Sequence, residues 1–285
     1  MRLPSFLRRH RLSPAWSYTP GGVIWRLLVS GDGHIVGEDR DTERKTVRFF
    51  CVDGRSGKVL WSNLVFEEQW WVGIEAVHGA VVLIHEFATP DMPDHLGIRA
   101  VDIETGRVLW GRRDATYSFA YKDRLYAVRA GSDSRTFIAL DVMSGEVVEE
   151  FPKGDDTILP LRSLAVSEVV EGAVEHPHPI GPAEHVDVGA ELPMHPKGAV
   201  GDVEMLQVGD RSVVGWYVTA PFRGDAPRFH QHLVVYSKDR SVEFEALVHD
   251  DAKAPLPDTF FAHSGILYFI TQDRTLNAMP LSRTQ

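Results

Sequence analysis

The side chains best suited to chemistry in this sequence are its histidines. Among 13 histidines, two pairs have the spacing His-x-His: His176 with His178, and His230 with His232. Because side chains two positions apart in an extended strand point to the same side, each pair can offer two imidazoles to one ion. The sequence therefore predicts a metal site at these four residues. Three carboxylates near the first pair could complete it: Glu175, Glu184 and Asp187.

A second interpretation of these histidines stays open. Residues 176–179 have the sequence His-Pro-His-Pro, and proline favours an extended conformation in the residue before it, which suits an exposed segment. The chain has one cysteine, so the Cys-rich spacings of structural zinc sites cannot occur. The residues indicate no cofactor other than a metal ion.

A second group of polar side chains lies earlier in the chain. His85 and Glu86 are followed by Asp91, Asp94 and His95, in what we expect to be a long loop between two strands. Loops on a rigid scaffold often collect binding residues. The alternative is an insertion that only decorates the rim of the fold.

Signatures of nucleophilic or phosphate chemistry are missing. The sequence has no Gly-x-Ser-x-Gly elbow and no Gly-x-x-x-x-Gly-Lys-Ser/Thr loop. Cys51 lies in an apolar run, residues 49–52, so we expect a buried small side chain and not a reactive thiol. These observations favour a binding protein over an enzyme.

The charge of the chain limits its partners. A net charge of −10 repels a phosphate backbone, so we expect no nucleic-acid partner. Residues 1–13 form a basic tail, in which Arg8 and Arg9 interrupt the apolar core of about 7–15 residues that a secretory signal needs. No apolar run approaches the roughly 18 residues of a membrane span. We expect a cytoplasmic protein, the alternative for the tail being a membrane-surface anchor.

The elements that must position these side chains are indicated by an internal repeat. The pattern Asp-x-x-Ser/Thr-Gly occurs three times, at intervals of 49 and 39 residues, and tryptophan follows the glycine by four positions in the first two copies. The repeat residues are Asp53, Gly57 and Trp61, then Asp102, Gly106 and Trp110, then Asp141 and Gly145, with Glu149 in the place of tryptophan.

Each copy of the repeat predicts a β-hairpin. The aspartate can accept hydrogen bonds from backbone N–H groups of the turn, and the glycine can adopt the left-handed conformation that reverses the chain. Two further strand-like runs precede each hairpin, as in residues 70–74 and 80–84. Four short strands in each unit of about 40–50 residues are typical of a propeller blade.

The repeat resembles that of the pyrroloquinoline-quinone-like (PQQ-like), or quinoprotein-like, propeller superfamily. The similarity is clearest in Ala-x-Asp-x-x-Thr-Gly-x-x-x-Trp at residues 100–110 and covers about the first half of the chain. Resemblance to the quinoprotein dehydrogenases would imply bound quinone and calcium, with a disulfide of adjacent cysteines over the cofactor. Cys51 alone cannot form that disulfide, so we expect no quinone. The resemblance then implies a fold and no particular chemistry.

The chain ends predict how the ring of blades closes. Residues 14–18, which contain Trp16, look like a fourth strand without a blade, and residues 276–281 look like a third strand without a successor. We expect the N-terminal strand to complete the C-terminal blade and so remove a sheet edge. The strands expected in the second half are 203–208, 212–219, 230–236 and 242–248 for one blade, and 259–262, 266–271 and 275–281 for the last.

The segment at about 152–200 is irregular and rich in proline and histidine. Counting it as one degraded blade gives six, with five or seven as alternatives. The sequence thus predicts an all-β, monomeric propeller of four-stranded blades over residues 14–285. Its expected role is binding or scaffolding of a protein or small ligand. The alternative is a metal-dependent enzyme or metal-binding protein that uses loop histidines and carboxylates near the central channel.

Overall fold

The computed structural model describes residues 12–89, 92–130, 135–152, 154–169, 174–180, 198–221 and 226–281. Within them the chain is all-β apart from one α-helix, and its strands form five antiparallel sheets. Two compact units are present, residues 20–173 and residues 1–19 with 174–285. Among the described residues, no helix combines the length and apolar character needed to cross a membrane.

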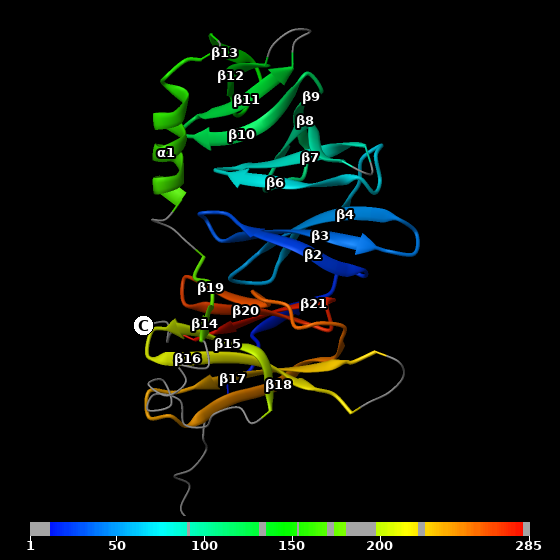
Figure 1. The fold of residues 1–285 in the computed structure, drawn as a ribbon, viewed down its shortest axis with the longest axis vertical. Helices are drawn as coiled ribbons and strands as arrows, with labels where there is room; N and C mark the ends of the chain where they lie inside the picture. The colour runs from blue at the N-terminus through cyan, green and yellow to red at the C-terminus, as the bar shows by residue number, and fades with distance from the viewer. Residues whose placement is uncertain are drawn as a thin grey trace, which may run out of the picture. The chain divides into compact units, whose positions relative to one another are not determined.

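Residues 20–173 contain three four-stranded sheets, in each of which consecutive strands pair (Figure 1). The first consists of β2 (Val23–Val29), β3 (His34–Asp41), β4 (Thr46–Asp53) and β5 (Val59–Leu64). The second consists of β6 (Val72–His78), β7 (Val81–Thr89), β8 (Met92–Asp102) and β9 (Val108–Arg112). The third consists of β10 (Ala115–Tyr121), β11 (Arg124–Ala130), β12 (Arg135–Asp141) and β13 (Val147–Phe151). The predicted four-strand units of the first half are therefore confirmed.

The other unit contains two sheets. The first has the order β14 (His178–Ile180), β15 (Ala199–Val208), β16 (Arg211–Thr219), β17 (Phe229–Tyr236) and β18 (Val242–Ala252). The second has the order β1 (Trp16–Tyr18), β21 (Thr275–Pro280), β20 (Ile266–Thr271) and β19 (Phe260–His263). Trp16 pairs with Ala278 across β1 and β21, which confirms that the N-terminal strand completes the C-terminal sheet.

The segment at 152–200 differs from the degraded blade that the sequence predicts. Its described residues form helix α1 (Ile158–Val169), which lies beside β10, and strand β14, which extends the next sheet. The helical sequence Ile-Leu-Pro-Leu-Arg-Ser-Leu-Ala-Val-Ser-Glu-Val lacks the two-residue alternation of a half-buried strand. Ile158 and Ala165 pack on the aromatic core of the third sheet. The count of six blades is therefore not confirmed.

The repeated turns have the predicted chemistry. In the first copy, Oδ1 of Asp53 accepts hydrogen bonds from the backbone N–H of Ser56 at 2.7 Å and from its hydroxyl at 2.5 Å. The glycine that follows, Gly57, has φ of 72°, in the left-handed region. The second and third copies repeat both features. Local side-chain chemistry thus fixes all three hairpins.

Two tryptophans join successive sheets of residues 20–173 in the same way. Nε1 of Trp61 donates a hydrogen bond to the carbonyl of Ile103 at 2.7 Å, and Trp110 does so to Val142 at 2.9 Å. Each acceptor directly follows the aspartate of the next repeat. A Cβ added at Gly106 would lie 2.8 Å from the Trp61 ring, and one at Gly145 would lie 2.4 Å from Trp110. Glycine is therefore needed at both positions for two reasons: a side chain would overlap the tryptophan ring, and the turn requires a positive φ.

The third repeat ends differently because no fourth turn of this type follows it. Glu149 stands where the first two repeats have tryptophan, and its carboxylate pairs with Arg124 at 2.7 Å. Helix α1 comes next in the chain. Cys51 is buried as predicted, and burial raises the pKa of its thiol to about 12.

Substituting Gly145→Ala tests the contact between tryptophan and glycine. We expect a loss of about 3 kcal/mol in the free energy of unfolding, since the methyl group adds a clash to a left-handed backbone. Gly79→Ala is the matched control, because Gly79 also has positive φ (55°) but open space around its Cβ. That change should cost about 1 kcal/mol. Equal losses in urea denaturation would show that the ring contact contributes nothing.

The turn at Asp53 makes stability depend on pH. The Ser56 hydroxyl, opposed by slight burial and helped by the Ser56 backbone N–H, holds the pKa of Asp53 below its usual range. Its stabilising effect is therefore complete above the unfolded pKa and is lost as pH falls through the folded one. We expect Asp53→Asn to cost about 1 kcal/mol at pH 7. The gap should narrow in denaturant titrations as the pH falls below the usual pKa of an aspartate, and a constant gap would contradict this account.

Candidate functional site

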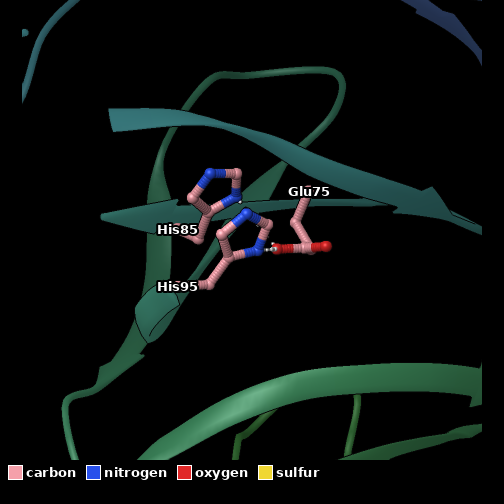
Figure 2. A group of neighbouring side chains, drawn as sticks. All are labelled: Glu75, His85 and His95. Carbon is pink, nitrogen blue, oxygen red and sulfur yellow. Dashed lines mark hydrogen bonds and ion pairs between the residues drawn. The ribbon is translucent and has the colours of Figure 1, made fainter. Parts of the chain in front are cut away.

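One sheet brings three potential metal ligands together. Glu75 lies on β6, His85 on β7 and His95 on β8, which are three neighbouring strands (Figure 2). Their ligand atoms all lie within 4.8 Å of one another. Among the residues that the structure describes, this is the one group of three or more histidine, cysteine or acidic side chains close enough to hold an ion.

Irregular strand pairing aims these side chains at one another. Ile74 pairs with Ile84 and Ala76 with Leu83, so Glu75 is an extra residue in β6. On the other side of β7, Ile84 pairs with Arg99 and Glu86 with Leu96, so His85 faces two residues of β8. Such bulges turn a side chain out of the regular alternation of a strand and are frequent beside functional sites.

The two imidazoles share one carboxylate oxygen. Oε2 of Glu75 lies 2.9 Å from Nδ1 of His85 and 2.6 Å from Nδ1 of His95. The two rings are stacked, with centroids 3.6 Å apart and planes inclined by 6°. Figure 2 shows the rings one over the other, with the carboxylate beside them. Two nitrogens thus lie beside the same carboxylate oxygen.

His85 is the most enclosed member of the group. Its side chain is 4% exposed, and neither ring nitrogen has a hydrogen-bond partner. Nδ1 is close to the Glu75 carboxylate, but the direction of approach does not satisfy a hydrogen bond. A buried polar group left without a partner costs about 1–3 kcal/mol. The fold therefore retains an imidazole whose Nε2 has no partner and whose Nδ1 has only the ion-pair contact with Glu75.

Glu75 is the acidic member of the group. Burial raises the pKa of its carboxyl, but the close contacts and charges of His85 and His95 outweigh burial and lower it overall. The group is therefore a carboxylate at neutral pH. Burial, followed by the charge of Glu75, raises the pKa of Tyr117 to about 12, so this phenol stays protonated.

Apolar and small residues enclose the imidazoles. Phe87 presents its ring at right angles to both, at centroid distances of 4.9 Å from His85 and 5.4 Å from His95. Gly73 pairs with His85, and a Cβ there would lie 3.4 Å from Nε2 of that ring and 3.0 Å from Oε1 of Glu38. The shell leaves His85 little room to move.

Two imidazoles and a carboxylate form a ligand set suited to divalent transition metals. His₂Glu sets hold catalytic zinc, and two histidines with one carboxylate also hold non-haem iron. Tetrahedral zinc separates its ligand atoms by about 3.3 Å, from bond lengths near 2.0–2.1 Å. The separations of 2.6 and 2.9 Å here would need to open by about half an ångström. Three protein ligands leave at least one coordination position for another group.

The four histidines predicted as metal ligands lie elsewhere. His176 and His178 are exposed, whereas His230 and His232 are half-buried on β17. His232 stacks on Trp216 at 5.3 Å. None of the four belongs to the group of three ligands, and a metal site at them stays a prediction. Two of the carboxylates predicted to help, Glu184 and Asp187, lie outside the described residues, as does Asp91.

Of the polar residues grouped from the sequence, the structure brings His85 and His95 together, whereas Glu86 pairs with Arg99. Both histidines are on paired strands and not in the long loop expected there. Glu75 was not predicted, although it is the one charged residue in a run of otherwise apolar residues and glycine at 72–77. A carboxylate directly after the predicted strand at 70–74, within an apolar run, was the available signal.

Comparison with known proteins gives little information on function. A family model described as a domain of unknown function (DUF4905) matches residues 29–110. No curated protein matches the chain. The match does not confirm the expected resemblance to the PQQ-like superfamily.

Several solved structures are similar over most of the chain. An acylaminoacyl peptidase of Pyrococcus horikoshii has 12% identity and a TM-score of 0.30, covering 89% of this chain and 36% of its own. The β-propeller domain of the trilobed protease of Pyrococcus furiosus has 11% identity and a TM-score of 0.31, and the match covers 88% of this chain and 64% of that domain. An uncharacterised protein of Listeria monocytogenes, lmo1340, has 7% identity and a TM-score of 0.33, and the match covers 90% of this chain and 94% of that protein.

The present chain thus spans 36% and 64% of the length of the first two of these structures. With TM-scores of 0.30 to 0.33, the three likenesses give no guide to activity. The three-ligand group of β6, β7 and β8 is the feature of this molecule from which a function can be argued.

Proposed function

We propose that this chain is a binding protein that holds a divalent transition-metal ion, with zinc the simplest choice, at Glu75, His85 and His95. The carrying observation is the His85 imidazole, 4% exposed and without a hydrogen-bond partner, with its Nδ1 beside a carboxylate. A metal ion would use that nitrogen, and its positive charge would be balanced in part by Glu75.

The surroundings support tight binding. The apolar edge of Phe87 and the stacked rings exclude water from His85, and a low local dielectric strengthens the attraction between a cation and the carboxylate. Tyr117, held protonated near Glu75, can donate a hydrogen bond that orients a ligand. Three strands of one sheet supply the ligands, so the site is built on rigid elements.

We further propose that the sheets are blades of one β-propeller over residues 14–285, which serves as a scaffold for a protein or small-molecule partner. The common four-strand meander and the completion of the last sheet by β1 support this interpretation. The sixth predicted blade has no counterpart among the described residues. Cytoplasmic location and a monomeric state stay predictions.

A metal-dependent enzyme is the second candidate. The observation in its favour is the number of protein ligands, because three leave a coordination position for water or substrate. Binding is placed first because the three side chains supply ligands for an ion, whereas catalysis would require a substrate site as well.

Zinc titration of protein purified without a histidine tag tests the metal site. We expect one zinc ion per chain by calorimetry. Replacing His95, which is 37% exposed, by alanine should weaken binding by about 100-fold or more, since loss of a ligand costs at least as much as loss of its supporting shell. Circular dichroism of the variant checks that it folds.

The double variant His230→Ala, His232→Ala is the matched control, because it also removes imidazoles, which lie on β17 and do not belong to the group of three ligands. It should bind zinc as the natural sequence does. Loss of binding in this control together with retention in His95→Ala would move the metal to the predicted histidine pair. Absence of binding by the natural sequence would overturn the proposal altogether.

A further inference from the structure

A second candidate site lies in the unit of residues 174–285. It is a groove of about 350 Å³ between the sheet β14–β18 and the segment 255–258 that leads to β19. Residues of β15 and β16 form its floor, and its walls come from Pro177, Pro179 and the segment 255–258. The groove shares no residue with the group of Glu75, His85 and His95.

The walls of the groove are apolar and rigid. Four prolines line it, and proline has no backbone N–H to donate: Pro177, Pro179, Pro255 and Pro257. Tyr217 is buried, and its hydroxyl donates a hydrogen bond to the carbonyl of Leu256 at 3.3 Å, which ties the wall to the sheet. Gly215 also lines the groove, and the ring of Phe260 fills the space on its Cβ side, 2.6 Å from where a Cβ would lie.

The charged groups that line the groove are all acidic. Asp202, Glu204 and Asp258 contribute carboxylates, and no lysine or arginine is among the described lining residues. Asp202 and Asp258 are exposed, whereas Glu204 is 8% exposed. The bottom of the groove therefore carries negative charge that no cation of the described lining offsets.

Glu204 is the residue that most needs a partner. Its Oε1 accepts a hydrogen bond from the backbone N–H of Asp258 at 3.0 Å, and no ion pair or other hydrogen bond is made by its carboxylate among the described residues. Burial raises the pKa of Glu204, the hydrogen bond opposes this, and the charges of Asp258 and Asp202 add to the rise. A bound cation would reverse these costs.

We propose that this groove binds a lysine or arginine side chain of a partner protein. The cationic head would meet Glu204, and the aliphatic stem would lie along the prolines and Leu256. The Tyr217 ring adds a surface on which a cation is attracted. Asp202 and Asp258 at the rim suit basic neighbours in the same segment, and the net charge of −10 favours encounter with a basic partner.

Short peptides test this proposal directly. The probes are acetyl-Gly-Gly-Arg-Gly-Gly-amide, the same peptide with lysine, and the same peptide with citrulline, which keeps the shape of arginine without its charge. Binding is followed by nuclear magnetic resonance of the full chain at low salt. We expect the arginine or the lysine peptide to bind at least tenfold more tightly than the citrulline peptide.

Glu204→Gln should reduce that binding at least tenfold while leaving thermal stability equal or higher, because it removes a buried charge that has one hydrogen bond but no ion pair among the described residues. Glu245→Gln, on β18 and outside the lining of the groove, is the control with the same change of net charge. Equal weakening by both variants, or unchanged binding by Glu204→Gln, would overturn the proposal.

A spermidine titration separates a protein partner from a free amine. If spermidine binds in a manner that depends on Glu204 and neither cationic peptide binds, the groove takes a small amine and the proposed protein partner is wrong. If no cation binds the natural sequence, the groove is not a cation site. Zinc titration of Glu204→Gln should be unchanged, which keeps this outcome separate from that of the metal site.

Discussion

The contact of each repeat tryptophan with the glycine of the next repeat is the constraint on which the sheets of residues 20–173 depend. Trp61 and Trp110 each fill the space that a Cβ would occupy, at Gly106 and Gly145, and each donates its indole N–H to the adjoining turn. One glycine therefore reverses the chain and admits the neighbouring ring. The same rule explains Glu149, which has no further turn of this kind to meet.

The second sheet is held by this contact on both sides, and it is the sheet that carries the candidate metal site. Trp61 reaches its turn, and its own Trp110 reaches the next one. On such a frame, the extra residue at Glu75 and the irregular pairing at His85 are features that the surrounding structure can hold in place. The regular strand pairs and the tryptophan contacts stabilise the sheet, and the two irregularities in register direct the ligand side chains.

Buried polar groups divide into two kinds in this molecule. Glu38 pairs with Arg40 at 2.8 Å, and Asp39 with Arg48 at 2.7 Å, so these charges are satisfied within the chain. The imidazole of His85 and the carboxylate of Glu204 are not satisfied to the same degree. Since an incompletely paired buried group costs free energy, both places fit the cations proposed for them. A cation at each place would supply what is missing.

The sequence by itself determined the hairpins and the strand that completes the last sheet. Asp53, Ser56 and Gly57 interact over a few residues, so their turn does not depend on the rest of the fold. Trp16 and the strand at 275–280 could be matched because each lacked its partner. Only the tertiary structure decided the site. Glu75, His85 and His95 meet because two irregularities in strand register turn them to one point, and register is set by packing across strands, which no local pattern encodes.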